Sequence, residues 1–264
     1  MAATLPLKIS TLGRDDPVVR RIGLGDLRDA LKEGAADFWA IPTHLFFLSL
    51  VYPIVGLVLA RLVFGFDVLP LLFPLTAGFA LVGPFAALGL YELSRRREAG
   101  LDTSWKHAFE VFRSPSFPAI VSLGLMLLLI FFVWISVANS IYVAAFGYAP
   151  AASIPDFIDQ ILSTEAGWWM ITVGNLVGFL FAFLVLSISV VSFPLLLDRH
   201  VSPIVAILTS VRAVALNPVT MAAWGLIVAA LLAIGSIPCL IGLAIVMPIL
   251  GHATWHLYRR VVVP

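Results

Sequence analysis

Long apolar runs without charged side chains dominate this sequence and restrict it to one class of fold. Residues 44–64, 71–91, 118–146 and 170–194 are each long enough and apolar enough to cross a bilayer, which takes about 20 residues in a helix. A helix closes its backbone hydrogen bonds within one segment, as hydrocarbon surroundings require. The sequence therefore predicts an all-α, polytopic membrane protein.

The composition excludes the other broad classes. Hydrophobic residues make up 61% of the chain and charged residues 12%, which is too few polar side chains to cover a water-soluble globule. Intrinsic disorder needs the opposite balance. The net charge is only +1, so no nucleic-acid partner is expected. Cys239 is the only cysteine, so an internal disulfide is impossible.

A fifth apolar stretch, residues 219–258, is about twice as long as one span needs. Glycine and proline interrupt it at Gly235 and Pro238, and proline disfavours helix at the residue before it. We interpret the stretch as two short spans, 219–234 and 238–255, joined by a tight turn. The alternative is one long kinked helix.

The distribution of basic residues favours six spans. Basic residues near span ends stay on the cytoplasmic side. With six spans and both termini inside, Arg61 is the only one of the 16 Lys and Arg residues that falls outside. We thus predict a cytoplasmic region at 1–43, which lacks the apolar run of a signal peptide, a transmembrane domain at 44–258 and a cytoplasmic tail at 259–264.

A short amphipathic helix is predicted before each pair of spans. The three segments are 26–40, 103–113 and 202–216, and helices of this kind beside a membrane usually lie in its interface. The predicted fold is therefore three hairpins, each preceded by a cytoplasmic interfacial helix. The apolar stripes consist of Leu27, Leu31, Ala35 and Phe38, of Trp105, Phe109 and Phe112, and of Ile204, Leu208, Val211 and Ala215.

The five histidines all fall on the inner side in this topology. His252 and His256 are four residues apart and share a helix face, a spacing that can chelate a metal ion. A haem would need one of these two plus His44 or His200 from another helix, because its axial ligands come from opposite faces of the ring. The favoured interpretation is that the inner histidines, His107 included, bond backbone or lipid headgroups and that no cofactor is bound.

Arg95, Arg96 and Arg97 form a dense basic patch at the inner end of the second predicted span. Basic residues at this depth attract anionic headgroups, each contributing about 1 kcal/mol. The patch is therefore a candidate lipid-headgroup site. Alternatively, it serves only to fix the topology.

Several short segments of the sequence form a recognisable pattern: 77–84 and 89–96, Gly100 and Trp105, and the closing segment 251–259. In these residues the chain resembles an uncharacterised bacterial membrane family, domain of unknown function 2189. The resemblance covers about 22–262 and implies a protein of the proteobacterial inner membrane. Some members carry a cytochrome c oxidase subunit label. The resemblance implies no catalytic residue.

The sequence contains no recognisable catalytic constellation. No nucleotide-binding loop, nucleophile elbow or zinc-protease motif is present, and no Asp, Glu or Lys falls in the middle of a predicted span. We therefore expect a non-enzymatic accessory, assembly or lipid-organising component. Its expected partners are membrane lipids and other membrane proteins. The alternatives are a small-solute permease and a haem- or metal-binding respiratory accessory subunit.

Overall fold

The computed structural model describes most of the chain outside the first predicted hairpin. The predicted span 44–64, His44 and most of the predicted span 71–91 lie outside the described residues. Secondary structure in the described part is helical, apart from an isolated antiparallel bridge between Val19 and Val262. The described residues are 17–41, 74–75, 83–85, 87–148, 154–237 and 242–263.

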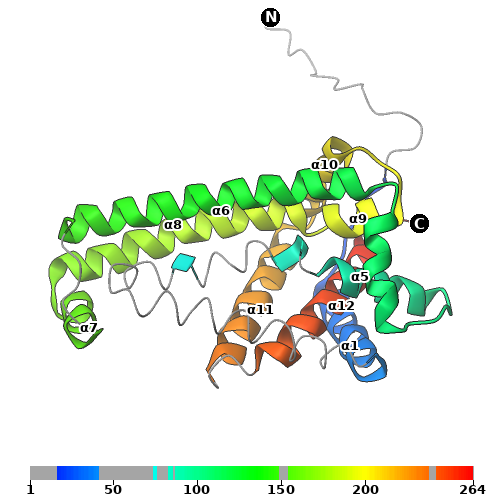
Figure 1. Ribbon diagram of the computed structural model, residues 1–264, viewed down its shortest axis with the longest axis horizontal. Coiled ribbons are helices and arrows are strands. Elements are labelled where there is room, and N and C mark those ends of the chain that lie inside the picture. Colours follow the sequence, from blue (N-terminus) through cyan, green and yellow to red (C-terminus); the bar gives the residue numbers. More distant parts are fainter. Residues whose placement is uncertain are drawn as a thin grey trace, which may run out of the picture.

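Ten helices build the described part of the molecule (Figure 1). Their order along the chain is α1 (Leu24–Ala40), α5 (Leu88–Glu98), η3 (Trp105–Arg113), α6 (Phe117–Phe146), α7 (Ile154–Ser163), α8 (Glu165–Ser189), α9 (Ser192–Asp198), α10 (Pro203–Leu216), α11 (Pro218–Ser236) and α12 (Leu243–Val261).

The helices α6 and α8 form one long hairpin, closed at its far end by α7 (Figure 1). The hydroxyl of Thr164 caps α8 by accepting a hydrogen bond from Gly167 N at 3.0 Å. Three helical stretches in the described residues are long and apolar enough to cross a membrane: Phe117–Phe146, Glu165–Asp198 and Pro218–Ser236. The structure therefore confirms an all-helical fold with several candidate spans.

The predicted break in the fifth apolar stretch is confirmed. Helix α11 ends at Ser236 and α12 begins at Leu243, so the alternative of one long kinked helix is wrong. The two helix ends approach closely at Gly235 and Gly242. A Cβ added to Gly242 would lie only 2.8 Å from Gly235 Cα. Larger residues would push the two helices apart there.

Helix α1 differs from its prediction because its apolar stripe is buried within the protein. It packs along α12, and Leu27 and Phe38 are almost inaccessible. A Cβ on Gly34 would lie 2.6 Å from Ala253 N, so the two helix backbones are nearly in contact. The stripe therefore serves helix packing, where the sequence suggested a membrane interface.

The other two amphipathic segments keep their apolar stripes exposed. In η3, which is a 3₁₀ helix, Trp105 and Phe112 are 54% and 60% exposed. In α10, Ile204 is 70% exposed, and the Ser202 hydroxyl caps the helix by accepting from Val205 N at 3.3 Å. These two stripes are suited to contact lipid.

Candidate functional site

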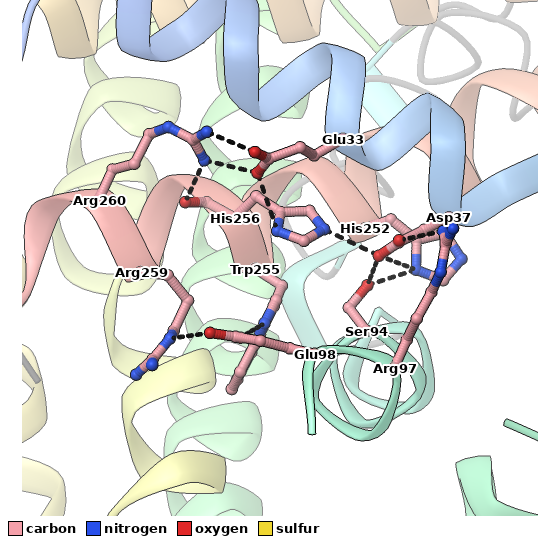
Figure 2. Close-up of polar contacts among 10 residues, drawn as sticks. All are labelled: Glu33, Asp37, Ser94, Arg97, Glu98, His252, Trp255, His256, Arg259 and Arg260. Carbon is pink, nitrogen blue, oxygen red and sulfur yellow. Dashed lines mark hydrogen bonds and ion pairs between the residues drawn. The ribbon is translucent and has the colours of Figure 1, made fainter. Parts of the chain in front are cut away.

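The most densely connected polar residues lie where α1, α5 and α12 meet (Figure 2). At their centre is Asp37, on the last turn of α1, whose side chain is only 6% exposed. Its Oδ2 accepts hydrogen bonds from Ser94 Oγ at 2.5 Å and from His256 Nε2 at 2.8 Å. Its Oδ1 accepts from Arg97 Nη1 at 2.6 Å. One carboxylate thus joins three helices.

Hydrogen counting fixes the arrangement of His252, which is also part of this cluster. Ser94 has one hydroxyl proton, and it goes to Asp37 because a carboxylate can only accept. Ser94 Oγ must therefore accept from His252 Nδ1–H, 2.7 Å away. The ring is fully buried, and its Nε2 has no hydrogen bond within the described residues, although the Leu90 backbone lies beside it. His252, Ser94, Asp37 and His256 consequently form one continuous hydrogen-bonded chain.

Glu33, one turn before Asp37 on α1, extends the cluster to the end of α12. It makes a two-pronged ion pair with Arg260, with both N–O distances at 2.8 Å. Its Oε2 also lies 3.2 Å from His256 Nδ1. Both nitrogens of His256 therefore face carboxylates, Asp37 and Glu33, and this imidazole bridges two acids on one helix. We call Glu33, Asp37, Ser94, Arg97, His252, His256 and Arg260 the polar cluster.

A second set of contacts ties the ends of α5, α9 and α12 together. Glu98 accepts from Trp255 Nε1 and from Arg259 Nε, both at 3.0 Å. Asp198, at the end of α9, accepts from the Tyr258 hydroxyl at 2.6 Å and lies 3.5 Å from Arg259 Nη1. Arg259 therefore connects the last turn of α12 to two other helices.

The cluster opens to the surface through a pocket of about 370 Å³. The pocket is wide and shallow, with Asp37 and His256 as its least exposed lining residues. Every lining residue is ionisable. They are Glu33, Asp37, Arg97, Glu98, His256, Arg259 and Arg260.

The two acids of the polar cluster have lowered pKa values. Burial alone would raise the pKa of Asp37, but hydrogen bonds from His256 and Ser94 outweigh it and hold the pKa below its ordinary value. The hydrogen bonds from Arg260 lower the pKa of Glu33, against a smaller opposing effect of burial. Both groups are therefore stabilised as carboxylates.

These lowered pKa values predict a loss of stability in acid. A depressed pKa in the folded state contributes stability above the unfolded pKa, about 4 for both groups, and this contribution is lost as the pH falls through the folded pKa values. The thermal midpoint in detergent should therefore fall as the pH is lowered from 6 to 3. The same titration of Glu33→Gln should be flatter. An equal slope for both proteins would show that Glu33 does not contribute.

Of the three haem- and metal-candidate histidines among the described residues, His252 and His256 lie in this cluster. His252 and His256 meet through Asp37 and Ser94, whereas His200 bonds Ser116 Oγ at 3.2 Å and His44 lies outside the described residues. Among the described residues, no group of three His, Cys, Asp or Glu side chains is placed to hold a metal ion. His107 belongs to a separate surface group, between Asp102 and Glu110.

Each arginine of the predicted headgroup patch has a carboxylate partner within the chain. Arg95 makes a two-pronged pair with Glu92, at 2.8 and 2.7 Å. Arg96 pairs with Glu110 at 2.7 Å, and Arg97 pairs with Asp37. Of the three, Arg97 alone lines the pocket. Binding of headgroups by the patch stays a prediction.

The sequence analysis missed the acids that organise this site. A signal was nonetheless present, because Leu27, Ala30, Gly34 and Asp37 follow one another at helical spacing and all are buried on α1. An acid in line with a buried stripe needs a partner. Its position on the buried face could have indicated that basic or hydroxyl groups elsewhere in the chain must meet Asp37.

Comparison with known proteins supports the membrane assignment. The family model described as "Predicted integral membrane protein (DUF2189)" matches residues 72–198, which confirms the resemblance over this segment. The match contains α5 to α9, and the closing segment 251–259 lies beyond it. No curated protein and no solved structure matches the chain.

Proposed function

We propose that this protein is a non-catalytic, multi-pass protein of the bacterial inner membrane that acts as an accessory or lipid-organising component. The observation that carries the proposal is the separation of charged and apolar surfaces in the molecule. The buried charged residues pair with one another where α1, α5 and α12 meet, and the long helices α6 and α8 expose apolar faces. Residues 72–198 match a family of predicted integral membrane proteins, which agrees with this separation.

The exposed faces of α6 and α8 support contact with lipid. Leu129 is 63% exposed, and Phe179 and Leu180 are 65% and 57% exposed. A contiguous apolar surface of this kind marks an interaction with membrane or protein. The exposed aromatic residues Trp105 and Phe112 of η3 continue this surface at the start of α6, where Phe112 contacts Phe117.

The burial and pairing of the side chains in the polar cluster support a non-catalytic role. Ser94 is the one hydroxyl in the cluster, and it has no exposed surface to meet a substrate. Asp37 and Arg97 are committed to each other, as are Glu33 and Arg260. These groups stabilise the protein and are not poised to react.

The contacts between helix ends support three hairpins. Residues in direct contact lie on the same side of a hydrocarbon core about 30 Å thick. Asp37 contacts Arg97, Glu98 contacts Arg259, and Asp198 contacts Tyr258. The intervals between these points therefore each contain an even number of crossings. Two spans per interval give six, with both termini in the cytoplasm according to the basic residues.

This topology predicts where reporters will be active. Green fluorescent protein fused after residue 98, 198 or 264 should fluoresce, because these positions lie in the cytoplasm. Alkaline phosphatase fused after Tyr148, at the far end of α6, should be active in the periplasm. A fluorescent fusion at 148 together with an inactive one at 264 would reverse the orientation. A difference between positions 98 and 198 would refute the paired crossings.

Extraction into native nanodiscs tests the proposed function. Polymer extraction keeps the surrounding lipids and bound proteins, which are then quantified by mass spectrometry against the bulk membrane. We expect enrichment of a lipid class or of specific membrane proteins. A lone chain in lipid of bulk composition would contradict the proposal.

A further inference from the structure

We propose that the pocket beside the polar cluster binds the zwitterionic phosphoethanolamine headgroup of a membrane lipid. This inference rests on the proposed lipid-organising function and names the lipid class. It differs from the anionic lipid that the Arg95–Arg97 patch suggests, because the pocket carries acids as well as bases.

The charges of the pocket lining favour a ligand that carries both signs. Three arginines and one histidine face three carboxylates across a space of about 370 Å³. Each arginine is already neutralised by an acid: Arg97 by Asp37, Arg259 by Glu98 and Arg260 by Glu33. A purely anionic headgroup would meet the repulsion of these acids. A zwitterion offers its phosphate to the guanidinium groups and its ammonium to the carboxylates.

The accessible side chains of the lining have the right mixture. At the rim, Arg97 is 38% exposed, Glu98 41% and Glu33 46% exposed, so both signs are in reach of a ligand. Figure 2 shows the Glu33–Arg260 and Glu98–Arg259 pairs on opposite sides of α12. The phosphate is expected beside Arg97, with the ammonium beside the carboxylate of Glu33 or of Glu98.

The depth of the pocket favours a lipid as the source of this headgroup. In the proposed topology the pocket lies at the inner ends of the spans, where aromatic residues gather at the headgroup level. Trp39 lies two residues after Asp37 and is 80% exposed. This exposed indole marks the level of the pocket as the membrane interface.

Competition between two lipids tests the proposal on the full-length protein. Nanodiscs are prepared from equal amounts of phosphatidylethanolamine and phosphatidylglycerol, and the lipids retained after detergent release are counted by native mass spectrometry. The native protein should retain phosphatidylethanolamine preferentially. Glu98→Gln should shift the ratio of the two lipids toward phosphatidylglycerol by about fivefold, since one surface charge contributes about that much. Glu33→Gln should shift it in the same direction.

The matched control is Glu165→Gln, which removes an exposed acid at the start of α8 outside the pocket and should leave the lipid ratio unchanged. A native protein that prefers phosphatidylglycerol, or a ratio insensitive to both pocket variants, overturns the proposal. If lipid is enriched but the ratio does not respond, the proposed function survives and the pocket assignment fails.

Soluble phosphoethanolamine is added as a competitor. If vesicles of phosphatidylethanolamine displace the retained lipid and soluble phosphoethanolamine does not, the site binds a lipid. If the soluble compound displaces the retained lipid equally well, the lipid assignment is overturned.

Discussion

Asp37→Asn should destabilise the protein more than any other single exchange of an acid for its amide in the polar cluster. The amide replaces one acceptor oxygen with a donor, although Ser94, Arg97 and His256 all donate to this carboxylate. Removing one partner of a buried ion pair costs about 3–5 kcal/mol, and the lower end applies here because Arg97 is 38% exposed. The expected loss of about 3 kcal/mol corresponds to a decrease of about 6–12 °C in the thermal midpoint.

The matched control is Asp29→Asn, the same exchange on an exposed position of the same helix. It should change the midpoint only slightly, because isolated surface charges contribute little. Thermal unfolding in detergent, followed by tryptophan fluorescence, measures both variants. Similar small effects from the two exchanges would mean that Asp37 is not the centre of a buried network.

Gly34→Ala should separate α1 from α12. The new methyl group would lie 2.6 Å from Ala253 N and 2.7 Å from Ala253 Cα, closer than van der Waals contact allows. Backbone atoms of a packed helix cannot turn aside as a flexible side chain can. Overpacking of this kind costs about 1–3 kcal/mol, and we expect about 3 because the clash is with backbone. The contacts of Glu33 and Asp37 with α12 should weaken as a consequence.

Gly25→Ala is the control for this second prediction. It lies on the same helix, and nothing approaches its added Cβ within 4 Å. Replacing glycine by alanine in a helix contributes up to about 1 kcal/mol of stability, so this variant should be neutral or slightly stabilised. Unfolding of both variants in detergent measures the difference. A stable Gly34→Ala protein would show that α1 does not pack on α12 at this distance.

The periodicity and punctuation of the sequence were sufficient to predict much of the helical fold. The break between α11 and α12 followed from Gly235 and Pro238, and α10 lies within the predicted amphipathic segment 202–216. Such signals are local, because each acts on the backbone of its own segment. The partner of an amphipathic stripe is not local. The stripe of α1 has the same spacing whether it faces lipid or α12, and only the close approach at Gly34 separates the two cases.

The candidate site was predicted only in part, for a similar reason. The spacing of His252 and His256 correctly placed both on one face of a helix, but it did not indicate that Asp37 would lie between them. Asp37 and His256 are 219 residues apart, and one sequence shows no sign of such a pairing. The arginine patch was predicted to bind anionic headgroups or to fix the topology, and the sequence did not indicate that each arginine pairs with an acid.

The ion pairs at the helix ends give the molecule its expected organisation in the membrane. They bring together parts of the chain that lie before, between and after the candidate spans. Asp37 and Arg97 enclose the first proposed hairpin, Glu98 and Asp198 enclose the second, and Asp198 and Arg259 enclose the third. An isolated helical hairpin would not need these contacts, so we interpret them as the link that holds the hairpins together on one side.

Cross-linking of the two chain ends tests this account most directly. Arg20 N donates to Val261 O and Val263 N donates to Val18 O, both at 2.9 Å, so Val19 and Val262 face each other as a non-hydrogen-bonded pair. Such pairs have Cα atoms about 4.5 Å apart, a distance that a disulfide can span.

The measurement is disulfide formation between Val19→Cys and Val262→Cys in a Cys239→Ala background, using native membranes and a mild oxidant. We expect a rapid cross-link, detected by its altered mobility in electrophoresis, and none when Val19→Cys is paired with Tyr148→Cys at the far end of α6. Failure of the first pair to cross-link, with both thiols reactive toward a maleimide, would contradict an arrangement in which both ends meet on one side of the membrane.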